Sequence, residues 1–139
     1  MATKTDFTDQ EWDALHKGLL GAGLLVATSD RGFFDTFKEA ASLAKHMAEA
    51  KQKSSSELIR DLADEGGTGF SKRTPEDELE RETLASLQTA KTALSTKAPD
   101  EWEPYKQLVL EIAESVANAA KGGEAAESAA IQKVREAVA

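Results

Sequence analysis

The chain has 139 residues, of which 40% are hydrophobic and 30% charged, and it contains no cysteine. This length suits one domain, 1–139, with a single hydrophobic core, and the lack of cysteine excludes disulfide frameworks, Cys-ligated zinc, iron–sulfur clusters and thiol nucleophiles. Asp and Glu total 25 against 17 Lys and Arg, giving a formal net charge of −8 that disfavours binding to nucleic acid.

The composition favours helices over strands, because 24 alanines and 14 leucines stand against only eight valines and isoleucines. Start and stop signals divide the chain into about six helices. Their approximate ranges are 9–28, 33–52, 55–65, 75–97, 101–120 and 124–138. We therefore predict an all-α, single-domain helical bundle.

The start of the first helix, 9–28, carries two recognisable signals. Thr8 and Glu11 have the spacing of a capping box, in which each side chain accepts a hydrogen bond from the other residue's backbone N–H. Phe7 and Trp12 have the spacing of a hydrophobic staple. The sequence therefore predicts a helix that begins at Asp9.

Three glycines, Gly18, Gly21 and Gly23, lie inside this helix. Each weakens a helix interior by about 1 kcal/mol relative to alanine, so a compensating role is expected. We interpret them as a smooth surface against which another helix packs closely. The alternative is a hinge or the close approach of a ligand.

Two later helices also carry start signals. Thr74 as cap and Pro75 as first helical residue predict the start of helix 75–97. Asp100 and Glu103 form a possible capping box for helix 101–120, where Pro104 is tolerable because it lies in the first turn.

The sequence shows an internal repeat when it is aligned with itself after a shift of 90 positions. Glu11-Trp12-Asp13 then falls on Glu101-Trp102-Glu103. We infer that 8–52 and 100–138 are copies of one helical hairpin, which cannot bury its apolar face alone. The duplication predicts pseudo-twofold symmetry, with Trp12 and Trp102 in equivalent environments.

Acidic residues gather at the corner between the two helices of each copy. They are Asp30, Asp35, Glu39, Glu124 and Glu127. Carboxylates beside a glycine-containing turn are candidate ligands for Ca²⁺ or Mg²⁺, although the spacing is not that of an EF-hand. In the alternative interpretation, the glycines end helices and the acids stabilise the next helix start through its dipole.

The two histidines are His16 and His46. Asp13 and His16 lie one helical turn apart, a spacing that can orient a general base or seed a metal site. A di-iron bundle would need a Glu three residues before each histidine, and Leu43 occupies that position before His46. We expect both histidines at surface or boundary positions.

The loop 66–73 combines flexible glycines with an aromatic residue and two cations. Phe70, Lys72 and Arg73 are candidates for anchoring a protein partner or an anion. The alternative is a mobile linker.

The sequence contains no Gly-x-Ser-x-Gly elbow, His-Glu-x-x-His helix or Ser-x-x-Lys element, so we expect no enzyme. The N-terminus lacks the apolar stretch of a signal peptide, and the longest apolar run, 19–27, is too short to span a membrane, which predicts a cytoplasmic protein.

The leading hypothesis is a non-enzymatic domain that acts through protein–protein interaction. The alternatives are a divalent-cation sensor and a carrier of a small molecule or lipid, with a cavity near Trp12 and Trp102.

The two helical corners resemble the TerB-like (tellurite-resistance) family of small acidic helical domains. The segments that carry this resemblance are Leu25-Val26-Ala27-Thr28-Ser29-Asp30-Arg31-Gly32…Glu39 and Val116-Ala117-Asn118-Ala119-Ala120-Lys121-Gly122…Glu127. The resemblance implies duplicated helix pairs and divalent-metal sensing in stress-response assemblies of the cytoplasm. This chain departs from the family's Asp-Gly step, since Arg31 separates Asp30 from Gly32. A different family of small acidic bacterial helical domains is the alternative.

Overall fold

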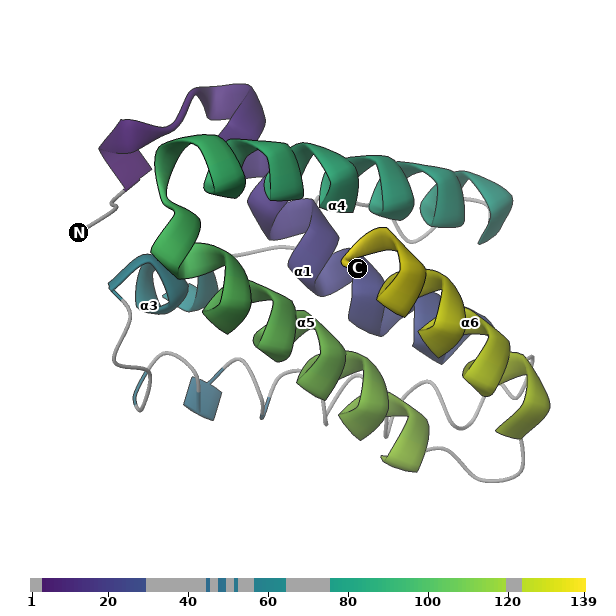
Figure 1. Ribbon diagram of the computed structural model, residues 1–139. Helices are drawn as coiled ribbons and strands as arrows, with labels where there is room; N and C mark the ends of the chain where they lie inside the picture. The colour runs from purple at the N-terminus through teal and green to yellow at the C-terminus, as the bar shows by residue number, and fades with distance from the viewer. Residues whose placement is uncertain are drawn as a thin grey trace.

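The computed structural model describes residues 4–29, 45, 48–49, 52, 57–64, 76–119 and 124–139. In chain order these residues form a short 3-10 helix η1 (Lys4–Asp6) and the helices α1 (Asp9–Ser29), α3 (Glu57–Asp64), α4 (Glu76–Lys97), α5 (Pro99–Ala119) and α6 (Glu124–Ala137) (Figure 1). No strand occurs among them, so the predicted all-α class is confirmed.

The described ranges contain five α-helices where the sequence predicts about six. The expected helix 33–52 lies outside them, apart from Lys45, Ala48, Glu49 and Gln52, which are helical. The observed bounds of the other helices agree with the predicted ones to within two residues. No helix of the described part is long and apolar enough to cross a membrane.

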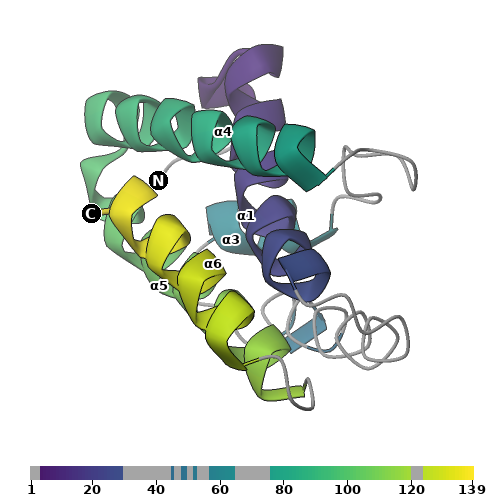
Figure 2. The same cartoon turned by 90° about the vertical axis from the view of Figure 1, so that its right-hand side faces the viewer.

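Helix α1 is the centre of the packing. It contacts α4, α5 and α6, and most of its described side chains are buried on every side of the helix. Figure 1 shows α4 and α5 leaving a common corner on either side of α1, and in Figure 2 α6 lies in front of α5, with both below α4. A helix that is apolar all round belongs in a core, which is what the Leu, Ala, Gly and Val content of α1 specifies.

The start of α1 has the predicted geometry. The backbone N–H of Thr8 donates to Glu11 Oε1 at 2.9 Å, and the N–H of Glu11 donates to Thr8 Oγ1 at 3.1 Å. The rings of Phe7 and Trp12 lie 6.4 Å apart, and both residues are buried. The capping box and the hydrophobic staple are therefore confirmed.

The predicted start of α5 is wrong by two residues. Ala98 N–H donates to Leu94 O at 2.8 Å, so Ala98 still belongs to the hydrogen bonding of α4, while its own carbonyl accepts from Glu101 N–H at 2.9 Å. The new helix therefore begins at Pro99, whose missing N–H costs nothing at the first helical position. Asp100 lies inside the first turn and cannot be the cap.

Trp12 and Trp102 occupy different environments, contrary to the expectation from the repeat. Trp12 is 5% exposed, whereas Trp102 is only partly buried and stacks on Tyr105 with a centroid distance of 6.2 Å. The difference follows from position, since α1 is surrounded and α5 has one side free of other described helices. The duplication itself stays a prediction.

Candidate functional site

The two sites proposed from the sequence fall mostly outside the described residues. This applies to Asp30, Asp35 and Glu39, to Phe70, Lys72 and Arg73, and to His46. Glu124 and Glu127 lie in α6, but their side chains are not described. Within the described ranges, no three His, Asp or Glu side chains come together as a metal site would need. The cation site and the loop site both stay predictions.

The interior contact between α1 and α5 explains one of the three glycines. A Cβ atom at Gly18 would lie 2.8 Å from the hydroxyl oxygen of Tyr105 and 2.9 Å from Leu87 Cδ2. Both distances are shorter than van der Waals contact, so a Cβ atom here would force Tyr105 or Leu87 to shift. The interpretation of Gly18 as a close-packing position is confirmed. The space that a carried ligand would need at this glycine is filled by Tyr105 and Leu87.

The side chain of Tyr105 anchors α5 to α1. It is completely buried, and its hydroxyl donates a 2.6 Å hydrogen bond to the carbonyl of Leu15 in α1. Burial raises the pKa of Tyr105 far above its ordinary value, because the phenolate would be desolvated. The phenol therefore stays a neutral donor and fixes α5 against α1.

His16 is 5% exposed, so the expectation of a surface or boundary histidine is wrong. The physical reason is the central place of α1, where even the helix side that carries His16 faces protein. Its Nε2 atom is buried and has no hydrogen-bond partner among the described residues. Asp13 is exposed and pairs with Lys17 at 3.5 Å, so the acid turns to solvent while the imidazole turns inward. The two do not form an acid–base pair.

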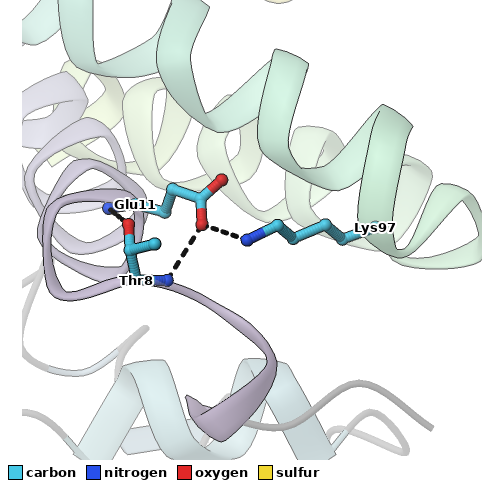
Figure 3. Close-up of polar contacts among 3 residues, drawn as sticks. All are labelled: Thr8, Glu11 and Lys97. Carbon is cyan, nitrogen blue, oxygen red and sulfur yellow. Dashed lines mark hydrogen bonds and ion pairs between the residues drawn. The ribbon is translucent and has the colours of Figure 1, made fainter.

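The start of α1 and the end of α4 are joined by a small polar cluster (Figure 3). Lys97 pairs with Glu11, and its ammonium group also lies 5.8 Å from the centre of the Phe7 ring. The Lys97 hydrogen bond, followed by the backbone N–H of Thr8, holds the pKa of Glu11 below its ordinary value. The arrangement is a structural clamp between two helix ends, in which Glu11 Oε1 accepts from both Thr8 and Lys97.

An open groove of about 370 Å³ lies between α4 and α6. Its lining residues are Leu84, Ala85, Gln88, Lys133, Glu136 and Ala137. The polar groups here hold the two helices together, since Gln88 Nε2 donates to Ala137 O at 2.9 Å and Lys133 pairs with Glu80. The groove could therefore contact another molecule through its surface, but its polar groups already interact within the fold.

A further surface feature of the described residues is one side of α5. Trp102 and Leu110 are partly buried and pack on the core, while Glu103, Gln107 and Glu111 are exposed. Residues eight apart lie slightly more than two helical turns from each other. Trp102 and Leu110 therefore form one row along the helix, and Glu103, Gln107 and Glu111 form the row beside it. We call these five residues the α5 face. The spacing of apolar residues along this helix predicts that Trp102 is buried. No local feature of the sequence indicates that it is partly exposed.

Trp102 differs from the other aromatic side chains that the structure describes. Phe7, Trp12 and Tyr105 are buried, and Trp102 alone among these four is partly exposed. Its indole stacks on the ring of the fully buried Tyr105, which supports it from the core side. The α5 face thus presents a fixed aromatic side chain next to a row of acids.

Comparisons of this chain with protein-family models, known proteins and solved structures find no match. Function is therefore inferred from the geometry of the described surface and from the sequence.

Proposed function

We propose that this protein is a non-enzymatic helical domain that acts through protein–protein interaction, with the α5 face as a contact surface. The observation that carries this proposal is the partial exposure of Trp102 beside Leu110. Tryptophan is enriched among the residues that dominate binding energy at protein interfaces, because its burial removes a large apolar area from water.

The contact between Trp102 and the buried Tyr105 also supports the proposal. Tyr105 is locked by its hydrogen bond to Leu15, and the indole of Trp102 stacks on its ring at an interplanar angle of 29°. A side chain that is already ordered in the free protein loses little conformational entropy on binding. Trp102 is therefore suited to act as a preorganised anchor.

The surroundings of Trp102 also fit a contact surface. Exposed polar positions border it, with Glu103 next in the chain and Gln107 on the adjoining row. An apolar centre with a polar rim is the usual anatomy of a protein–protein interface. The α4–α6 groove is a weaker candidate, because its lining contains no aromatic residue and Gln88 is engaged with Ala137.

Site-specific photo-crosslinking in the source cells tests the proposal. A photoreactive residue at Gln107, on the α5 face, is compared with one at Thr89, which is exposed on the outer side of α4. We expect one defined protein to crosslink at position 107, not at 89, and to be lost with Trp102→Ala. Equal capture at both positions, or capture that survives Trp102→Ala, contradicts the proposal.

A further inference from the structure

We infer that the α5 face takes a basic amphipathic helix of its partner protein. This inference rests on the proposed function and names the chemistry of the partner. Its basis is the placement of an apolar row and an acidic row side by side along one helix. A partner helix with one apolar and one basic row matches both at once.

The acidic row carries charge that the described fold does not neutralise. Between Pro99 and Ser115, the exposed positions of α5 are Asp100, Glu103, Pro104, Gln107, Glu111 and Glu114. Glu114 pairs with Arg135 of α6 at 2.7 Å, which marks the edge of the face. Glu103 and Glu111 have no ion pair within the described residues. These two carboxylates favour a cationic partner.

The spacing of these two carboxylates sets a register for the partner. Glu103 and Glu111 are eight residues apart, which corresponds to about 12 Å along the helix axis. Trp102 and Leu110 have the same separation on the adjoining row. A partner helix that runs along α5 would meet both carboxylates with Lys or Arg residues seven or eight positions apart.

The single cation in this stretch does not reverse the charge balance. Lys106 is half-buried and lies between Trp102 and Leu110 in the chain. Its aliphatic stem can extend the apolar row while its ammonium group stays in water. Glu103 and Glu111 against this one lysine leave the face acidic.

Net charge argues against three other occupants. At −8 overall, two copies of this chain repel each other, and an acidic face repels the phosphates of nucleic acid or anionic lipid. The same field attracts a basic segment and speeds its encounter with the face. A second copy is therefore the less favourable occupant, and the experiment below detects it.

The test is a titration of the full chain with a helical peptide of Leu and Lys, about 18 residues or five turns long. The same peptide with Glu in place of Lys is the charge control. Trp102 reports binding through a blue shift of its emission and protection from acrylamide quenching. Trp102→Phe leaves only the buried Trp12 as an emitter, so this variant should show no response.

Charge variants separate the α5 face from a general attraction to an acidic protein. Glu103→Gln with Glu111→Gln should weaken binding of the Lys peptide by about three- to tenfold, as for two partly exposed ion pairs. Asp77→Asn with Glu78→Gln on α4 removes the same charge elsewhere and should leave affinity unchanged. Unfolding midpoints of all variants establish that each one is folded.

Three outcomes overturn the inference. They are equal binding of the Glu peptide, an equal loss of affinity in the α4 control, and self-association that Trp102→Ala abolishes. If position 107 crosslinks to a partner segment that is not a basic helix, the inference fails while the proposed function stands. If neither a partner nor the peptide contacts the α5 face, both fail.

Discussion

The hydroxyl of Tyr105 lies 2.8 Å from the point that a Cβ atom at Gly18 would occupy. The same hydroxyl donates its hydrogen bond to the Leu15 carbonyl, one turn earlier in α1. The missing side chain at residue 18 thus lets the phenol of α5 reach the backbone of α1. This contact fixes the helix that carries Trp102.

Gly18→Ala should destabilise the protein even though alanine favours helix. The new methyl group meets Tyr105 and Leu87 below 3 Å, and such overpacking costs about 1–3 kcal/mol. The gain in helix propensity of about 1 kcal/mol offsets only part of this loss. Urea unfolding of the two proteins measures the difference. A more stable alanine variant contradicts the close-packing interpretation.

Tyr105→Phe should lower the free energy of unfolding by about 0.5–1.5 kcal/mol, since it deletes one buried hydrogen bond. The same change removes the atom that Gly18→Ala would strike. The double variant should therefore be less destabilised than the sum of the two single variants, a coupling that urea unfolding of all four proteins resolves. Additive effects would show that the Tyr105 hydroxyl and the methyl group at residue 18 do not compete for the same space.

The same contact joins two positions that are equivalent in the predicted repeat. Residues 15 and 105 correspond under the 90-position shift, but the contact is one-sided, from the Tyr105 hydroxyl to the Leu15 carbonyl. The different exposures of Trp12 and Trp102 show that any symmetry does not extend to the surface. The duplication stays a prediction from the sequence.

His16→Leu should stabilise the protein by about 1 kcal/mol. The imidazole Nε2 is buried without a partner in the described part of the chain, and leaving a polar atom unsatisfied costs about 1–3 kcal/mol, which an apolar side chain of similar size avoids. Thermal and urea unfolding check the direction. A loss of stability on this substitution would mean that the imidazole makes a contact that leucine cannot replace.

The sequence predicts best the features that depend on a few neighbouring residues. The capping box of Thr8 and Glu11 is an example, because both partners lie within one turn. The packing role of Gly18 also follows, since three glycines in a helix require compensation. The cap at Ala98 could not be predicted, because Asp100 offers the better local signal and the continuation of α4 overrides it.

Burial of His16 and exposure of Trp102 depend on which helix lies at the centre. The apolar residues on all sides of α1 do contain that information, and a histidine among them is then expected inside. For α5, the stripe of Trp102, Tyr105 and Val109 indicates a buried side but not where the neighbouring helices end. The α5 face results from packing between helices that are distant in the sequence, so no local sequence pattern predicts it.

The clamp between Glu11 and Lys97 should make stability depend on pH in the acid range. Lys97 lowers the folded-state pKa of Glu11 below its ordinary value of 4.5. A carboxyl group with a lowered folded pKa stabilises the fold above its unfolded pKa and loses this contribution as pH falls through the folded pKa. Lys97→Met keeps a long stem beside Phe7 but removes the charge. We expect this variant to be less stable than the natural protein at neutral pH and the difference to shrink below about pH 4.

Thermal unfolding of both proteins between pH 3 and pH 7 measures this dependence, with Glu11→Gln as the matched control. The amide oxygen of the substituted side chain can still accept the hydrogen bond from Thr8 N–H, so this variant separates the charge from the capping contact. In the Glu11→Gln background, Lys97→Met should have a smaller effect that no longer changes across the acid range. A difference that stays constant with pH in the natural background would assign the role of Lys97 to its contact with Phe7 and not to its ion pair.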